Sequence, residues 1–250
     1  MIVLMSVKYK RILLKLSGEA IKGSRDYGID PKFLVFIAKE IQGAIQLGIE
    51  VAIVIGGGNI FRGVQGSASG MNRTRADQMG MMATVMNGLA LLDALERAGQ
   101  LTQAFCAIEM PRVMNLFHRD EAAKALDRGE VCVFSGGTGN PFFTTDSAAA
   151  LRGAELEVDE VLKGTQVDGV YDADPHKVKT ARRFEEVSFA TCLSERLQVM
   201  DASAFAICQS EGVRLRVFNM HQENALEKAL LGEVKGTLVG VGLESIYATS

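Results

Sequence analysis

The stretch "VFSGGTGNPFFTTDSAAALRG", residues 133–153, joins an apolar run to an alanine-rich run through a loop of glycine, proline and threonine. The apolar run fits a buried strand and the alanine-rich run fits a helix, so the stretch predicts a strand–loop–helix unit. A loop that only connects two elements rarely leaves so many backbone N–H groups without side-chain cover. Two interpretations follow: ordinary turn chemistry, or a phosphate site.

The same alternation of apolar runs and amphipathic stretches continues along the chain. It is typical of βαβ units and predicts a mainly parallel sheet with helices on both faces. We find no internal repeat or linker, and therefore expect one α/β domain over residues 1–250. The expected strands are 11–18, 51–58, 101–108, 131–137, 160–165 and 214–220, and the expected helices are 31–47, 75–98, 120–128, 145–154, 190–211 and 224–232.

The composition limits the classes of function. The 250 residues are 48% hydrophobic, without a run of about 18 apolar residues that would span a membrane. The charges near the start follow or interrupt the apolar residues, unlike those of a signal peptide, and we expect a cytoplasmic protein. A net charge of −3 and an aromatic content of 6% argue against nucleic-acid binding. Any anionic ligand must then be held by a local site.

Cysteines and histidines are scattered. The cysteines form no CxxC pair and lie in apolar settings, which favours buried free thiols over a metal or redox role. The histidines cannot supply a metal cluster, and we expect no metal site built from protein side chains. These residues are Cys106, Cys132, Cys192, Cys208, His118, His176 and His221.

Ligands of such sheets bind outside the carboxyl ends of the strands, and several of these ends are rich in glycine. In "LLKLSGEA" (13–20), Lys15 lies near the end of an apolar strand, and Gly18 follows. A buried ammonium needs an anion beside it, whereas a lysine on an edge strand could extend into water.

In "VIGGGNIFRG" (54–63), three consecutive glycines would let backbone N–H groups approach a phosphate, and Arg62 could bind its oxygens in bidentate fashion. A loose turn with a solvated arginine is the alternative. The motif is neither a Walker P-loop nor a dinucleotide fingerprint.

In the opening stretch, Thr145 or Asp146 is expected to cap the following helix. Capping does not explain the glycines of the same loop, and Asp146 could also orient a neighbouring lysine.

In "LKGTQVDGVYDADP" (162–175), Asp-Gly and Asp-Pro indicate turns. The segment could equally hold a nucleotide, with Tyr171 against the base and Asp174 accepting a hydrogen bond from the ribose.

Taken together, these motifs resemble those of the bacterial uridylate kinases (UMP kinases) of the amino acid kinase family. The resemblance covers nearly the whole chain, because "YKRILLKLSGEA" (9–20), "ADQMGMMATVMNGLALLDALE" (76–96), "VMDASAFAICQ" (199–209) and "RVFNM" (216–220) also occur in the family's order and spacing. It implies a three-layer α/β/α sandwich and transfer of the γ-phosphate of ATP to UMP, in pyrimidine nucleotide synthesis. Mg²⁺ would be held mainly by the nucleotide phosphates.

The resemblance also implies roles for individual residues, with about 8–160 mainly on the UMP side and 160–245 mainly on the ATP side. Gln166 stands where many members carry lysine or asparagine. The catalytic residues would be Lys15, Arg62, Asp146 and Lys163. The ATP site would comprise Lys15, Leu16, Ser17, Gly18, Gly58, Arg62, Thr165, Gln166, Tyr171 and Asp174. The UMP site would comprise Gly57, Asp77, Thr138, Gly139, Asn140, Pro141, Phe142, Phe143, Thr144 and Thr145.

Regulation and assembly follow from the same resemblance. The segment "IKGSRDYGID" (21–30) matches the place where such enzymes sense GTP as an activator, although a polar turn explains it as well. The residues concerned are Gly23, Ser24, Arg25, Asp26, Tyr27 and Gly28. Family members usually form hexamers inhibited by UTP, and the methionine-rich stretch 79–95 fits either a subunit contact or an internal core.

Two other functions are compatible with parts of the sequence. Another amino acid kinase, acting on a carbamate or a carboxylate, would share Lys15 and Asp146 but would not need the "GTGNPFFTT" loop (137–145). A non-catalytic nucleotide-binding or storage protein on the same fold would be expected to carry substitutions among the phosphate-facing residues. Lys15, Arg62, Asp146 and Lys163 are all present here.

Overall fold

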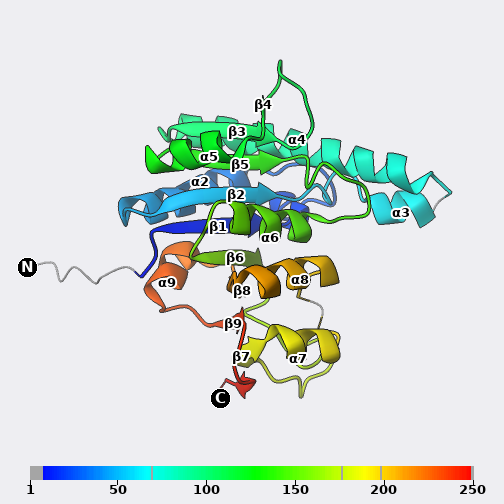
Figure 1. Cartoon of the computed structure of the whole chain (residues 1–250), viewed down its shortest axis with the longest axis vertical. Helices are drawn as coiled ribbons and strands as arrows, with labels where there is room; N and C mark the ends of the chain where they lie inside the picture. Colours follow the sequence, from blue (N-terminus) through cyan, green and yellow to red (C-terminus); the bar gives the residue numbers. More distant parts are fainter. Residues whose placement is uncertain (1–7, 69, 176, 198, 249–250) are drawn as a thin grey trace, which may run out of the picture.

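The computed structural model describes residues 8–68, 70–175, 177–197 and 199–248, and within them ten strands form one sheet (Figure 1). The strands are β1 (Arg11–Leu16), β2 (Glu50–Ile55), β3 (Thr102–Cys106), β4 (Asn115–Leu116), β5 (Val131–Ser135), β6 (Glu160–Thr165), β7 (Phe184–Ser188), β8 (Leu215–Asn219), β9 (Gly236–Gly240) and β10 (Ile246–Tyr247). Their order is β10-β7-β9-β8-β6-β1-β2-β5-β3-β4. All pairs from β8 to β4 are parallel, whereas β9 runs antiparallel to β8 and β10 antiparallel to β7.

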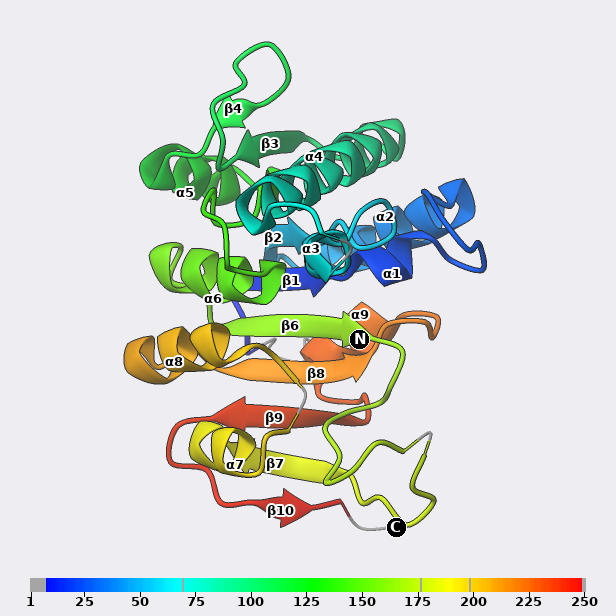
Figure 2. The same cartoon turned by 90° about the vertical axis from the view of Figure 1, so that its right-hand side faces the viewer.

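Helices cover both faces of the sheet (Figure 2). They are α1 (Gly18–Ile21), α2 (Pro31–Gln46), α3 (Gly63–Ala68), α4 (Arg73–Arg97), α5 (Arg119–Asp127), α6 (Thr145–Glu155), α7 (Phe189–Ser194), α8 (Ala202–Glu211) and α9 (Ala225–Leu231). Side chains of β1 alternate between the faces. Ile12 and Leu14 pack in a cluster with α2, α4 and α9, and Leu13 packs in a cluster with α5, α6 and α8. The predicted three-layer α/β/α arrangement is confirmed.

The six expected strands are all present, but one expected helix is wrong. Residues 190–211 form α7 and α8 instead of a single helix, because Arg196 adopts a left-handed backbone (φ 54°) and Asp201 caps a new helix. The expected helix 75–98 begins two residues earlier, at Arg73, where Asn72 is the cap. Strands β4, β7, β9 and β10 and helices α1 and α3 were not predicted.

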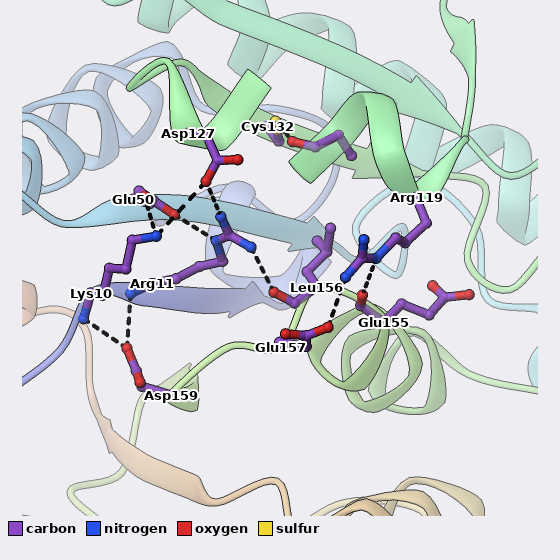
Figure 3. A network of polar contacts seen from close by, with 11 residues as sticks. Lys10, Arg11, Glu50, Arg119, Asp127, Cys132, Glu155, Leu156, Glu157 and Asp159 are labelled. Carbon is purple, nitrogen blue, oxygen red and sulfur yellow. Dashed lines mark hydrogen bonds and ion pairs between the residues drawn. The ribbon is translucent and has the colours of Figure 1, made fainter. Parts of the chain in front are cut away.

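The amino-terminal edge of the central strands is held by matched charges (Figure 3). Nε of Arg11 lies 2.6 Å from Oε2 of Glu50, and its Nη2 lies 2.8 Å from Oδ1 of Asp127. The carboxylate of Asp159 accepts hydrogen bonds from the backbone N–H groups of Lys10 and Arg11. These contacts tie β1 to β2, α5 and the start of β6, so the charges at this edge serve the fold.

No helix within the described residues is long and apolar enough to cross a membrane. The four cysteines are buried and free, which confirms the expectation from their apolar settings. Burial raises the pKa of Cys132, Cys192 and Cys208 to about 12. These thiols are therefore packing groups.

The short helix α9 depends on a side chain from another helix. Its cap residue, Asn224, has a left-handed backbone (φ 57°) and makes no capping bond with its own side chain. Instead, Glu40 of α2, only 4% exposed, accepts from the N–H of Asn224 at 2.8 Å and from that of Leu226 at 3.0 Å. A carboxylate at a helix N-terminus also interacts favourably with the helix dipole.

We expect Glu40→Ala to lower the free energy of unfolding by about 2 kcal/mol, because it leaves the buried N–H of Leu226 and the more exposed N–H of Asn224 without their acceptor. Glu223→Ala, which removes an exposed ion pair with Lys39, should change it by less than ~0.5 kcal/mol. Urea denaturation of the two variants measures the difference. Equal destabilisation by both would contradict a capping role for Glu40.

Candidate active site

Sheet topology places a ligand site at the carboxyl ends of β1 and β6. The chain builds β2, β3, β4 and β5 on one side of β1, then returns to build β6 and β8 on the other. Parallel sheets bind ligands where the strand order reverses in this way. Lys15 of β1 and Lys163 of β6 are direct register partners there. Two ammonium side chains therefore come from adjacent positions of β1 and β6, the neighbouring strands at the switch point (Figure 2).

Asp146, in the first turn of α6, bridges the two lysines. Its Oδ1 lies 2.7 Å from Nζ of Lys15, and its Oδ2 lies 2.9 Å from Nζ of Lys163. Lys163 also donates to the carbonyl of Val199. None of the three charged side chains is more than 15% exposed. Two ammonium charges against one carboxylate leave one positive charge, which makes the cluster receptive to an anion.

The pKa values follow from this crowding. Burial alone would raise the pKa of Asp146, but the charges of Lys15 and Lys163 outweigh it and hold that pKa below the ordinary 3.8. Burial lowers the pKa of Lys163 below the ordinary 10.5, and the neighbouring Lys15 lowers it further. An incoming phosphate would favour the ammonium form of Lys163 and so relieve this effect.

Two glycine segments pack backbone against backbone next to the cluster. A Cβ added to Gly18 would lie 2.4 Å from the backbone nitrogen of Gly58, and one added to Gly56 would lie 2.8 Å from that of Gly18. Side chains are therefore excluded from the contact between the end of β1 and residues 56–58, which we call the glycine loop. Leu16 is buried in the core, and the side chain of Ser17 caps α1.

A cavity of about 430 Å³, cavity A, lies between the glycine loop, α4 and the loop 137–145. It gathers most of the residues expected at UMP and two of those expected at ATP. Gly139 packs instead against Ala107, and Phe142 is 67% exposed; with Pro141, they do not line the cavity. The expected residues that line it are Gly57, Gly58, Arg62, Asp77, Thr138, Asn140, Phe143, Thr144 and Thr145.

The carboxylate of Asp77 accepts hydrogen bonds from two other residues of the chain. Asp77 lies one turn inside α4, because the helix begins earlier than the expected residue 75, and it accepts from Nε of Arg73 at 2.8 Å and from the N–H of Phe142 at 2.8 Å. The guanidinium of Arg73 also lies 5.5 Å from the centre of the Phe142 ring. Sequence reasoning missed Arg73, although an arginine four residues before an aspartate on a helix is a known pairing signal.

The cap of α6 differs from the expectation. Thr144, and not Thr145 or Asp146, is the N-cap, and its hydroxyl oxygen accepts from the N–H of Asp146 at 3.0 Å. That hydroxyl also donates to Asp201, which accepts from Ser147 at 2.9 Å and caps α8. Asp201 was missed because it was placed inside a continuous helix. It joins the start of α6, and so the position of Asp146, to α8.

A second cavity of about 550 Å³, cavity B, lies beside β6, the loop after it and the turn between α7 and α8. The hydroxyl of Tyr171 donates to Asp168 at 2.6 Å, and burial together with this bond raises the pKa of Tyr171 to about 12. Gln166 does not line this cavity, whereas the turn residues Glu195, Arg196 and Leu197, missed for the same reason as Asp201, do. The expected residues that line it are Lys163, Thr165, Tyr171 and Asp174.

Arg62 lies between cavity A and a third cavity of about 560 Å³, cavity C. Its guanidinium pairs with Glu19, and its Nε donates to the carbonyl of Gly58 at 3.3 Å. Asp26 and Tyr27 line cavity C, so the segment expected to sense GTP borders the same arginine. Arg25 of that segment donates to the carbonyl of Ile29. Across the described part of the chain, no group of three His, Cys, Asp or Glu residues could hold a metal ion.

Comparisons with known proteins agree on one family. The model of the amino acid kinase family matches residues 10–219. A uridylate kinase of Magnetococcus marinus is 53% identical over 230 residues, covering 92% of this chain and 95% of the relative. A uridylate kinase of Pseudomonas paraeruginosa is 52% identical over 235 residues, covering 94% and 96%.

Solved structures agree with this family. The crystal structure of UMP kinase from Bacillus anthracis aligns with a TM-score of 0.92 at 35% identity, covering 96% of this chain and 99% of that one. UMP kinase from Ureaplasma parvum aligns with a TM-score of 0.87 at 40% identity, covering 92% and 98%.

The lowered pKa of Lys163 generates a prediction about proton uptake. A bound phosphate favours the ammonium, so ATP binding should raise this pKa from its lowered value towards 10.5. Between the two values the protein takes up protons on binding, and affinity falls as pH rises through that window. Calorimetry at a pH within that window, in two buffers of different ionisation enthalpy, should show the uptake in the wild type.

Two variants make this measurement specific. Lys163→Met has no amine to protonate and should lose the proton uptake. Lys177→Met removes an exposed lysine of the same cavity and should retain it. Undiminished proton uptake in Lys163→Met would assign the titration to another group.

Proposed function

The chain belongs to the amino acid kinase family, and on that premise we propose that it is a uridylate kinase, which transfers the γ-phosphate of ATP to UMP and forms UDP and ADP. The observation that carries the proposal is the lysine–aspartate–lysine cluster at the border of two cavities. Asp146 follows Thr145 of cavity A and pairs with Lys163 of cavity B. A phosphoryl group passing from one cavity to the other would meet this cluster.

The chemistry requires positioning and charge neutralisation more than a covalent partner. The attacking group is a phosphate oxygen of UMP, already an anion, so no general base is needed. We assign Lys15 and Lys163 to the charge that develops on the transferred phosphoryl, and Asp146 to the orientation of both ammonium groups. Arg62, which lines cavities A and C, would bind phosphate oxygens once substrate replaces Glu19 as its partner.

The cavities divide the substrates between the two parts of the chain. We place UMP in cavity A, which is lined by residues between 57 and 145, and the adenosine of ATP in cavity B, lined by residues between 163 and 217. This supports a UMP side over about 8–160 and an ATP side over about 160–245 within one domain.

Mg²⁺ would enter with the phosphates of ATP as part of that substrate, because both oxygens of the central carboxylate, Asp146, are taken by lysines. The reaction would take place in the cytoplasm, where both nucleotides occur.

Regulation and assembly belong to the proposal as well. We infer GTP activation through residues 23–28, because cavity C joins that segment to Arg62. We also infer inhibition by UTP. A hexamer is supported by the exposed methionines of α4, Met79, Met82 and Met86. Light scattering of the wild type and of Met86→Glu tests the hexamer, which the variant should weaken. ADP release with and without GTP or UTP tests the two effectors. A wild type that is monomeric and whose rate changes with neither nucleotide would refute all three points.

The activity is tested by coupled ADP release with MgATP and, in parallel, UMP, CMP, dUMP, carbamate and acetylglutamate. We expect strong turnover with UMP. Turnover with a carbamate or carboxylate alone would move the protein to another branch of the family. ATP binding without turnover of any acceptor would indicate a storage or sensor protein.

In the same assay, Lys15→Ala should lower kcat by roughly 10²–10³-fold or more, because it removes a preorganised charge at the transferred group. Lys10→Ala, on the opposite edge of the sheet and with a side chain that is 73% exposed, should leave kcat unchanged. Circular dichroism and thermal melting show whether both variants fold. A fall in activity that only follows the loss of folded protein would give Lys15 a structural role alone.

A further inference from the structure

A pair of asparagines is buried directly behind the glycine loop. Asn59 follows the loop and is 3% exposed, and Asn87, in the middle of α4, is fully buried. Nδ2 of Asn59 donates to Oδ1 of Asn87 at 3.0 Å, and Nδ2 of Asn87 donates back to Oδ1 of Asn59 at 2.7 Å. Burying two amides in this way is costly unless their donors find acceptors.

The remaining donors of the pair bind the backbone. Nδ2 of Asn87 donates to the carbonyl of Gly56 at 2.7 Å, and Nδ2 of Asn59 donates to the carbonyl of Gly28 at 2.8 Å. The carbonyl of Asn59 accepts from the N–H of Gly28 at 3.1 Å. The four hydrogen bonds of the pair form a closed network that holds the backbone at Gly56 and at Gly28. Gly18 packs against Asn59.

A second polar side chain of α4 has the same kind of contact. Thr84 lies three residues before Asn87 and so on the same side of the helix, and it is 3% exposed. Its hydroxyl accepts from the N–H of Gly136 at 2.7 Å, at the start of the other loop of cavity A. Two buried polar residues of one helix thus each hold the backbone of one loop of the cavity.

We propose that the Asn59–Asn87 pair is the positioning unit of the glycine loop, and that Asn87 is a positioning residue for the phosphate of the uridylate. A loop of three glycines has no side chains to fix its backbone, and glycine populates more conformations than any other residue. Contacts with residues outside the glycine loop must therefore fix its backbone conformation. The inference rests on the proposed function, because it takes the phosphate of UMP as the group that the loop binds in cavity A.

The test compares UMP with uridine, which lacks the phosphate. In Asn87→Leu, of similar size but without donors, we expect the dissociation constant of UMP to rise by at least about tenfold, the scale of one lost hydrogen bond to a charged group. The constant for uridine should change less than about twofold, within the error of additive effects at separate sites. Calorimetry measures both constants below the melting temperature of each variant.

Two further variants keep the test decisive. Asn87→Asp retains the acceptor for Asn59 but loses the hydrogen bonds that Asn87 donates to Gly56 and to Oδ1 of Asn59, and it replaces Asn87→Leu should that variant not fold. Glu160→Gln changes an equally buried polar group at the amino-terminal edge of β6, where it contacts Arg216. It should lower stability and leave the ratio of the two constants unchanged.

The outcomes separate the two proposals. Selective loss of UMP binding supports the positioning role. Equal loss of UMP and uridine binding, or no loss of either, overturns it while leaving the kinase proposal in place. A wild-type protein that neither binds nor phosphorylates UMP would instead refute the proposed function itself.

Discussion

The repulsion between Lys15 and Lys163 is the constraint on which the rest of the site depends. The parallel register of β1 and β6 makes them direct partners, and burial leaves little water to screen their charges. Asp146 stabilises the arrangement because each of its oxygens faces one ammonium. The position of Asp146 is fixed by the N-cap of α6, where the hydroxyl of Thr144 donates a hydrogen bond to Asp201, the N-cap of α8. Asp201, at the start of α8, therefore helps to fix the position of Asp146.

The two edges of the sheet use charge in opposite ways. At the amino-terminal edge, the cations Lys10 and Arg11 both pair with the carboxylates of Glu50 and Asp127, so these charges are used by the fold (Figure 3). At the carboxyl edge, one carboxylate serves two lysines, and cavities adjoin the cluster. Balanced charges stabilise a structure, whereas an excess of one sign next to a cavity prepares it for a ligand. Stability and chemistry are thereby separated along the strands.

The sequence predicted those features that depend on a single segment of the chain. The central strands are continuous apolar runs because both their faces are buried, and Lys15 was conspicuous within such a run. A strand near the edge of the sheet, such as β7 with the sequence FEEVS, lacks that signal. The sequence did not predict the break before α8 or the contacts of Asp201 and Asn87, because each depends on partners distant in sequence. A polar residue within a helix looks like a solvated one until its partner is known.

Internal carboxylates pair with the two arginines that line cavity A. Glu19 holds Arg62, while Lys22 and then Arg62 keep the pKa of Glu19 below its ordinary value; Asp77 holds Arg73. Binding of a phosphate is then an exchange of one anion for another, and the affinity reflects the difference between them. A carboxylate carries one charge, whereas a phosphate monoester carries nearly two at neutral pH. A site built on such exchanges favours phosphates over carboxylates, which fits a kinase whose acceptor is itself a phosphate.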